Sequence, residues 1–165
     1  MYLSPKPALC EALPMLDNAL LWTMRAWVIG HCRNRDTAER INAVFGKLGA
    51  ATATGHLGGF MTVLSRGAVR SLEINCVCHP AVSDDEATLL EIVSLQQHER
   101  HEEAYERLVG MTTEAAAVAG CDQANRLALA LIEAGRVLAT RPDFARQFTE
   151  LTSEPFAPSH LNFLH

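Results

Sequence analysis

Residues 83–110 read SDDEATLLEIVSLQQHERHEEAYERLVG and carry the clearest helix signal in the chain. Ser83 and Glu86 have the spacing of a capping box, in which the serine and glutamate side chains each accept a backbone N–H at the start of a helix. The two aspartates between them add negative charge to the first turn, where the helix dipole is positive. The pattern predicts a single helix that continues to Val109 and ends at the glycine that follows.

The apolar face of this predicted helix has a polar centre. On a helical wheel, Gln97 and His101 fall among the apolar positions, which are Leu90, Val93, Ala104 and Leu108. One interpretation is a buried glutamine and histidine that hydrogen-bond to partners, and a second places both at the edge of the face. A third is a ligand pocket. The residues that would line it are Gln97, His101, Tyr105 and His31, the last from the apolar stripe of the first helix.

Four other segments show helical periodicity. They are residues 11–32, 36–48, 54–66 and 112–138, of which the last is either one helix or a pair broken near residue 120. Residues 11–32 are apolar nearly all round, which is typical of a helix that is central or contacts a second chain. Asp36 and Glu39 predict a second capping box. We therefore expect an all-α, single-domain bundle of five to seven helices.

Residues 70–78 break the helical rhythm, because apolar and polar side chains alternate there with a period of two. The pattern predicts one short isolated strand between the third and fourth helices. One strand cannot satisfy its own backbone groups, so it is either a solvated linker or pairs with its twin across a two-fold axis. The second alternative predicts a homodimer. Its contacts would come from Leu72, Ile74, Trp22 and Ile29.

Cysteine and histidine provide the one chemical lead, since thiolate and imidazole are zinc ligands. The candidate ligands are Cys76, Cys78, His79, His98 and His101. Geometry disfavours four of them in one chain, because His98 lies about 21 Å along the predicted helix. The residues between Cys78 and the helix start span at most about 20 Å. The leading expectation is therefore that the protein has no cofactor. Zinc is the alternative, because ligands drawn from two chains would relax this limit.

The cysteines at positions 76 and 78 also have a simpler interpretation as small apolar side chains of a strand. A redox pair is less favoured, because C-x-C lacks the C-x-x-C spacing of thioredoxin-like sites and no helix begins directly behind it. The five cysteines are odd in number and irregularly spaced, which indicates reduced thiols in a cytoplasmic protein.

The composition excludes several classes of protein. The chain has 165 residues, of which 48% are hydrophobic and 20% are charged, with a net charge of −5. It is therefore too apolar for a disordered chain and too acidic for a generic nucleic-acid binder. No segment has the ~18 uninterrupted apolar residues of a membrane span, and no secretory signal is recognisable. We expect residues 1–151 to form one domain and the apolar tail, residues 152–165, to dock on it or on another chain.

Charge is unevenly divided along the chain. Residues 1–80 hold eight Lys and Arg against five Asp and Glu, whereas residues 81–165 hold six against fourteen. A loose basic zone contains Arg25, Arg33, Arg35, Arg40 and Lys47. It is either a solvated face or a surface for an acidic partner, such as the acidic half of a second copy.

These observations favour a non-enzymatic interaction or regulatory module that forms a homodimer. Contact surfaces are plentiful, and the sequence shows no catalytic motif. The alternative is a protein that binds a metal or a small ligand through His98 and His101, assisted by Cys76, Cys78 or His79. An enzyme of unknown type is the third hypothesis. A protein partner is expected, whereas nucleic-acid and membrane partners are not.

Overall fold

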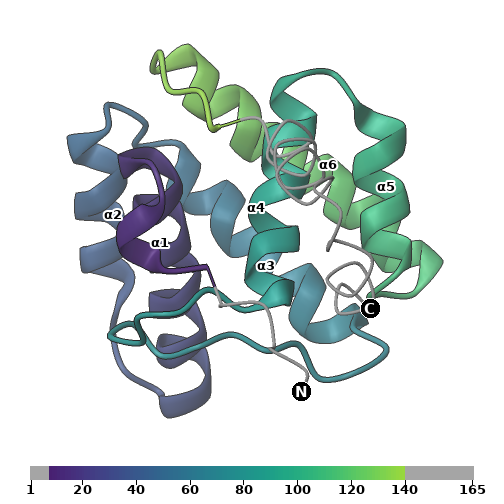
Figure 1. The fold of residues 1–165 in the computed structure, drawn as a ribbon, viewed down its shortest axis with the longest axis horizontal. Coiled ribbons are helices and arrows are strands. Elements are labelled where there is room, and N and C mark those ends of the chain that lie inside the picture. The colour runs from purple at the N-terminus through teal and green to yellow at the C-terminus, as the bar shows by residue number, and fades with distance from the viewer. Residues whose placement is uncertain (1–7, 140–165) are drawn as a thin grey trace, which may run out of the picture.

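The structure, a computed structural model, describes residues 8–139. In that range it consists of six α-helices and one short 3-10 turn without a β-sheet, which confirms the predicted all-α architecture (Figure 1). The helices are α1 (Met15–Arg33), α2 (Ala38–Lys47), α3 (Ala53–Gly67), α4 (Asp84–Gln97), α5 (His101–Val109) and α6 (Glu114–Glu133). None of these helices is long and apolar enough to cross a membrane. The expected tail, residues 152–165, lies outside the described residues, as does its boundary at residue 151.

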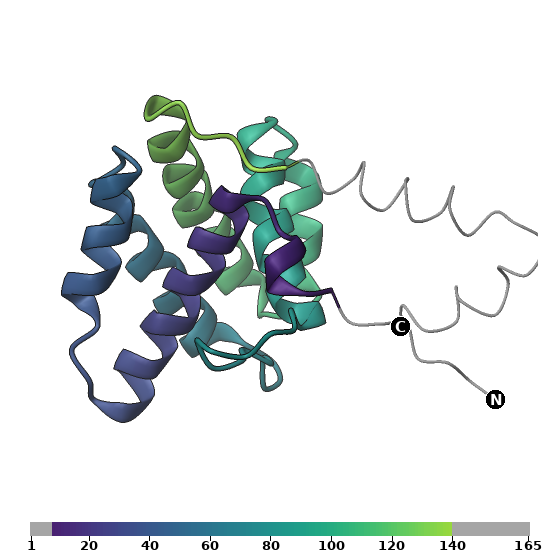
Figure 2. The ribbon, with the colours of Figure 1, turned by 60° about the vertical axis from the view of Figure 1, so that its left-hand side comes forward.

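The helices form two groups that share one core. Helices α1, α2 and α3 contact one another, as do α4, α5 and α6, and the groups meet where α3 packs on α6 and α1 packs on α4. Figure 2 shows α1 lying between α2 and the second group. The core is mainly aliphatic, with Phe45 and Phe60 as its two fully buried aromatic side chains among the described residues. Leucine and alanine stripes on the helices thus account for most of the buried apolar surface.

Two glycines allow α3 and α6 to approach closely. A Cβ at Gly67 would overlap the Cβ of Ala116, and a Cβ at Gly59 would overlap the side-chain amide of Gln123. The first overlap is with a rigid methyl group next to the backbone, whereas the second is with the end of a flexible side chain. The α3–α6 contact therefore depends more strongly on Gly67.

The start of α4 is as the sequence predicts. The Glu86 amide donates to Ser83 Oγ at 3.1 Å, and the Ser83 amide donates to Glu86 Oε2 at 2.9 Å, which completes the capping box. Gly49 ends α2 with a φ of 75°, a left-handed conformation that costs glycine little. These features confirm the local signals at both positions.

The predicted helix over residues 83–109 is wrong in one respect, because it is broken after Gln97. Glu99 adopts a left-handed conformation with a φ of 59°. The Arg100 amide donates to Leu95 O at 2.9 Å and the Glu99 amide donates to Gln96 O at 3.1 Å, which is the Schellman pattern of a helix end. No glycine marks this end, so the sequence carried no warning of it. The second half, α5, runs in another direction and its helical wheel has a different phase.

The structure decides one alternative that the sequence left open and corrects one expected helix start. Helix α6 passes through Gly120 without a break, so the single-helix alternative is confirmed. A side chain at Gly120 would crowd Leu108, so glycine permits the close contact with α5. The capping box expected from Asp36 and Glu39 does not form. Helix α2 begins one residue later, after Thr37, whose hydroxyl donates to Ala26 O at 2.9 Å, while Asp36 Oδ1 accepts from the Ala38 amide at 3.2 Å.

The predicted strand is not formed within the described chain. Residues 69–82, here called the strap, contain a turn at residues 77–78 and belong to no sheet. Single bridges join the described chain at Leu9 to Ala81 and at Ala68 to Thr112. Leu72 and Ile74 pack against the protein's own core. The alternating pattern therefore indicated correctly that Leu72 and Ile74 lie on an apolar side of this segment. Their burial does not require pairing with a second copy, because they pack against the core of the same chain.

Candidate functional site

A fully buried ion pair lies between the strap and the core. Arg25 on α1 is 2% exposed and Glu86 on α4 is fully buried, and Arg25 Nε and Nη2 donate to the two carboxylate oxygens at 2.7 and 2.8 Å. The hydrogen bonds with Glu86 raise the pKa of Arg25, although burial acts in the opposite direction. Removing two charges from water is costly, and the cost is offset only when the remaining donors and acceptors are also satisfied.

The strap supplies those remaining partners. Arg25 Nη1 donates to Cys76 O at 3.2 Å and to His79 O at 2.8 Å, and Arg25 Nη2 donates to Ala81 O at 2.7 Å. Glu86 in turn accepts the amide of Asn75 at 2.9 Å. The backbone groups that a strand would present to a neighbouring strand thus bond to buried side chains. This explains how an isolated extended segment is stable inside one chain.

A second carboxylate fastens the first half of the strap. Asp85 accepts two hydrogen bonds from Arg70 at 2.8 and 2.9 Å and one from the Glu73 amide at 2.7 Å. The bonds from Arg70 hold the pKa of Asp85 below its usual value, with a further lowering by the Glu73 amide and an opposing effect of burial. The first turn of α4 therefore serves as the anchor of the whole strap.

The end of the strap presents two thiols. Residues 76–79, here called the thiol turn, are closed by a hydrogen bond from the His79 amide to Cys76 O at 3.0 Å. Cys76 Sγ and Cys78 Sγ are 3.5 Å apart, and both side chains are exposed. Arg25 holds the carbonyls at both ends of this turn. The two thiols are thus carried by a turn whose backbone is held by the buried Arg25 side chain.

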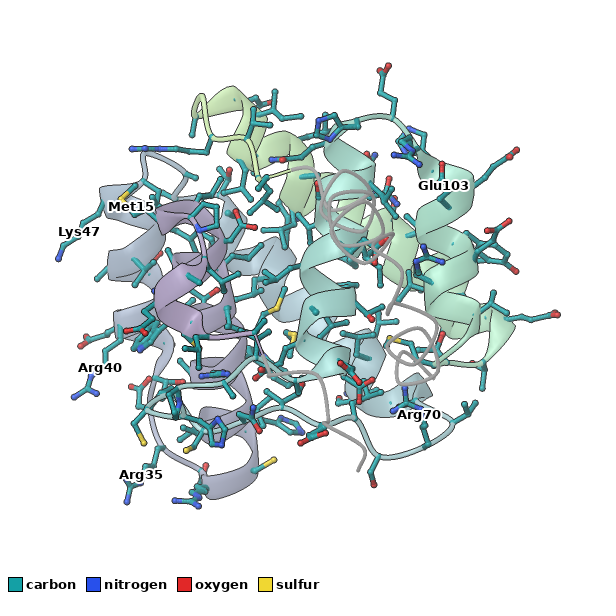
Figure 3. The ribbon with its side chains drawn as sticks, viewed as in Figure 1. Met15, Arg35, Arg40, Lys47, Arg70 and Glu103 are labelled. Carbon is teal, nitrogen blue, oxygen red and sulfur yellow. The ribbon has the colours of Figure 1, made fainter. Side chains whose placement is uncertain are left out.

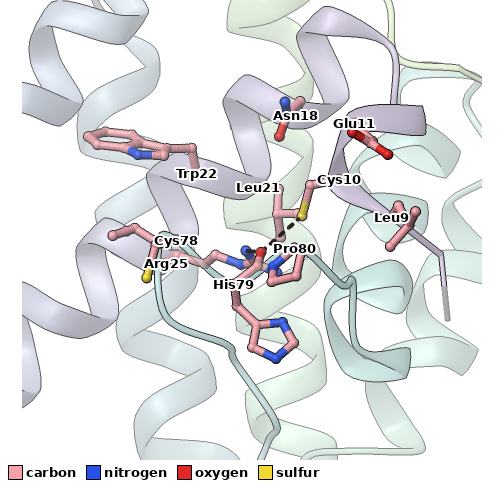
Figure 4. A pocket seen from close by; sticks show the side chains of 11 residues that line it. Leu9, Cys10, Glu11, Asn18, Leu21, Trp22, Arg25, Cys78, His79 and Pro80 are labelled. Carbon is pink, nitrogen blue, oxygen red and sulfur yellow. Dashed lines mark hydrogen bonds between the residues drawn. The ribbon is translucent and has the colours of Figure 1, made fainter.

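A hollow of about 440 Å³ lies beside the thiol turn (Figure 4). One wall is α1, with Leu21, Trp22 and Arg25, and the facing wall is the end of the strap with Cys78 and His79. Cys10 closes one side, where its thiol donates to His79 O at 3.4 Å. The hollow therefore combines an aromatic ring, aliphatic side chains and sulfur atoms.

The predicted metal ligands do not converge. Cys76, Cys78 and His79 lie at the strap, before the first residue of α4, whereas His98 and His101 follow its last residue (Figure 1). In the described chain, no group of three or more His, Cys, Asp and Glu side chains has a geometry suited to a metal ion. The length of α4, about 21 Å for 14 residues, separates the two sets.

Hydrogen bonds assign other roles to the histidines. Nδ1 of His79 lies 3.1 Å from the Ala81 amide nitrogen and 3.2 Å from Ala81 O, so the backbone of the strap holds this ring. Nδ1 of His98 lies 2.8 Å from Ser94 O at the end of α4. His101 bonds through Nδ1 to Oε1 of Gln96. Each ring therefore has a structural partner of its own.

The predicted ligand-pocket residues are divided among three places. Gln97 accepts the Leu138 amide at 2.8 Å and donates to Arg136 O at 2.9 Å, so it fastens the segment after α6. His31 is exposed and stacks on Trp27, with ring centroids 4.8 Å apart. His101 and Tyr105 do lie together, in an open hollow of about 520 Å³ between α5 and α6. The break after Gln97 is the reason that the helical wheel grouped them incorrectly.

The expected dimer contacts are only partly accessible. Leu72, Ile74 and Trp22 are half-buried and pack against the core, and Ile29 is half-buried on α1. Three exposed aliphatic side chains lie instead on α6, where Val118 is 62% exposed, Leu129 48% and Ile132 39%. These positions have no separate signal in the sequence beyond the helical periodicity of residues 112–138.

The basic zone is smaller than expected. Arg25 does not belong to it, because this side chain is buried against Glu86. Arg35, Arg40 and Lys47 project from the side of the molecule that carries α2, and Glu103 projects from α5 on the opposite side (Figure 3). Sequence reasoning missed the Arg25–Glu86 pair. An arginine in the middle of an apolar helix was its one signal, since arginine is seldom fully buried without a partner.

Comparison with known proteins gives no assignment. No protein-family model matches the chain, and neither curated proteins nor solved structures gave a significant match. The function is therefore inferred from the geometry of the molecule itself.

Proposed function

We propose that the protein is a non-enzymatic interaction module that forms a homodimer through the outer face of α6. The observation that carries the proposal is a row of side chains here called the α6 stripe. It consists of Val118, Cys121, Asn125, Leu129 and Ile132. Their spacing of three and four residues places them on one side of the helix. Three of the five are exposed aliphatic side chains, with Val118 toward one end of the row and Leu129 and Ile132 toward the other. A group of exposed apolar side chains on one side of a helix marks a contact site.

The stripe is complementary to itself in an antiparallel arrangement. A two-fold axis through Asn125 would place Val118 opposite Ile132 of the second copy and Cys121 opposite Leu129 of the second copy. Asn125 would then face Asn125 of the second copy, and the two side-chain amides could exchange hydrogen bonds. A central asparagine in an apolar helix contact fixes the register of the pair. A second copy is therefore the occupant that fits the stripe best, because the same surface supplies both sides.

Polar groups border the stripe on both sides. Asp122 and Arg126 form an ion pair at 3.0 Å, with both side chains 57% exposed. On the other side lies the open hollow between α5 and α6, which Glu102 and Glu106 also line. An apolar centre with a polar rim is the usual anatomy of a protein contact. Because the stripe is only about 21 Å long, we expect a small interface and a dimer that dissociates at roughly micromolar concentration.

The five cysteines support a reducing compartment as the place of action. All of them are free thiols in the structure, and two of them lie only 3.5 Å apart without being bonded. Secreted proteins of this size seldom keep exposed free thiols. We therefore propose a cytoplasmic location as part of the same functional assignment.

The chain offers a matched pair of substitutions to test the dimer. Val118 on the α6 stripe and Val69 on the strap are both 62% exposed. Sedimentation or light scattering over a concentration series should show a dimer for the wild type and for Val69→Glu, and a monomer for Val118→Glu. Circular dichroism would verify that both variants are folded. A wild type that stays monomeric at high concentration, or a Val118→Glu variant that still dimerises as Val69→Glu does, would contradict the proposal.

A further inference from the structure

We propose that Cys76 and Cys78 are a thiol–disulfide couple that exchanges with low-molecular-weight disulfides such as oxidised glutathione. The first observation is the distance of 3.5 Å between the two sulfur atoms. A disulfide bond is about 2.05 Å long, so a small approach of the sulfur atoms closes the bond. Both side chains are exposed, which gives a small disulfide access to them.

The turn conformation makes this approach feasible for a C-x-C sequence. Two residues in a fully extended chain span roughly 7 Å, which is at the upper limit of Cα separation for a disulfide. Residues 76–79 are folded into a hydrogen-bonded turn, with the His79 amide donating to Cys76 O at 3.0 Å. The turn therefore shortens the span between positions 76 and 78. The C-x-C spacing and the lack of a helix directly behind it disfavoured a redox pair in the sequence, since neither feature reveals this turn.

The buried ion pair keeps the turn in place. Arg25 donates to Cys76 O and to His79 O, which are the first and last carbonyls of the thiol turn. Arg25 is itself fixed by Glu86, so the turn cannot open without breaking bonds to a buried charge. Two thiols held in this way lose little freedom when they form a bond. Preorganisation of this kind favours closure of the ring over reaction with separate small thiols.

The other three cysteines differ from this pair. Burial raises the pKa of the Cys121 thiol, which reduces its thiolate fraction. The Cys10 thiol is half-buried and donates to His79 O at 3.4 Å. Cys32 is exposed and lies next to the last residue of α1. Within the chain, the 76/78 pair is thus the one in which the structure shows two exposed sulfur atoms in contact.

The reaction balances with the small disulfide as oxidant. The thiolate of one cysteine attacks a sulfur atom of the small disulfide, so a mixed disulfide forms and one small thiolate leaves. The thiolate of the second cysteine then attacks the protein sulfur of the mixed disulfide and releases the second small thiolate. The two cysteines lose two electrons and two protons. The small disulfide takes up both and becomes two thiols.

The experiment equilibrates the full-length protein with glutathione at a series of ratios of reduced to oxidised form. After acid quenching and alkylation, peptide masses report the state of every cysteine. We expect the peptide that contains residues 76–78 to lose both alkylation sites together, with a mass lower by two hydrogens. Cys32→Ser is the matched control and should keep this behaviour. Cys78→Ser should stop at a mixed disulfide on Cys76.

A further variant tests the role of the turn without removing sulfur. Val77 is 37% exposed, so Val77→Gly should leave the fold intact while it loosens the thiol turn. Glycine raises the entropy cost of ordering the backbone, so we expect the equilibrium constant for disulfide formation to fall by roughly two- to fivefold. The proposal is overturned if Cys76 and Cys78 both stay alkylated at every ratio. It is equally overturned if they form only mixed disulfides, or if either pairs with Cys10.

Discussion

Replacing Glu86 by glutamine is the sharpest test of how the strap is held. The Glu86 carboxylate accepts four hydrogen bonds, from Arg25 Nε and Nη2 and from the amides of Asn75 and Ser83. Each carboxylate oxygen receives two of them, so an amide nitrogen in either position would face two buried donors. The charge of Arg25 would also lose its counter-ion at a site that is 2% exposed.

The size of the effect follows from this geometry. Breaking a fully buried ion pair by removing one partner costs about 3–5 kcal/mol. We expect Glu86→Gln to lower the free energy of unfolding by this amount, which is a large part of the roughly 5–15 kcal/mol of a typical domain. The matched control is Asp122→Asn, which removes an ion pair with Arg126 whose side chains are both 57% exposed. Exposed pairs contribute little, so this change should stay within about 0.5 kcal/mol.

Urea unfolding followed by circular dichroism measures both variants on one scale, with the midpoint reporting stability and an unchanged slope reporting an intact two-state transition. Hydrogen exchange adds a local measurement, because the amides of Asn75 and Ser83 donate directly to Glu86. Both should lose protection in Glu86→Gln before the core helices do. Equal midpoints for Glu86→Gln and Asp122→Asn, or unchanged protection in the strap, would refute the reasoning.

Three further predictions use other contacts of the structure. Gly67→Ala should lower the free energy of unfolding by about 1–3 kcal/mol, because the added methyl group overpacks against α6. Gly55→Ala in the same helix should raise it by about 0.5–1 kcal/mol, because no atom lies near the added methyl group. Urea midpoints that move in the same direction for both variants would contradict the close helix contact. Because the pKa of Asp85 is lower in the folded than in the unfolded protein, its stabilising effect is complete above the usual carboxyl value of 3.8 and is lost as the pH falls through the lower folded value. Asp85→Asn should therefore lose less stability than the wild type between pH 5 and pH 2, and parallel pH profiles would speak against the assignment. Burial raises the pKa of the Cys121 thiol, so alkylation at about pH 8 should modify Cys121 more slowly than Cys32. Mass spectrometry of the labelled peptides would measure both rates, and equal rates would argue against burial as the cause.

The candidate site was only partly accessible to sequence reasoning. Residues 76–79 were singled out for their cysteines and histidine, and the structure does place two of those sulfur atoms in contact. The expected zinc ligands lie partly before the first residue of α4 and partly after its last residue, and the length of the helix keeps the two sets apart. The α6 stripe was overlooked because the buried side of the same helix gave a stronger pattern. Exposed apolar positions become informative only when the covered side of a helix is known.

The sequence by itself determined the helices, the cap of α4 and the turn at Gly49, because these depend on periodicity and on hydrogen bonds within about four residues. It could not determine the break at Glu99, where the chain is left-handed without a glycine. Nor could it determine the partner of Arg25, which lies 61 residues away along the chain. Only tertiary packing brings α1, the strap and α4 together, and the need to satisfy buried polar groups then decides the path of the strap. The same packing also decides which side chains stay at the surface, and these include the thiols of the thiol turn and the exposed residues of the α6 stripe.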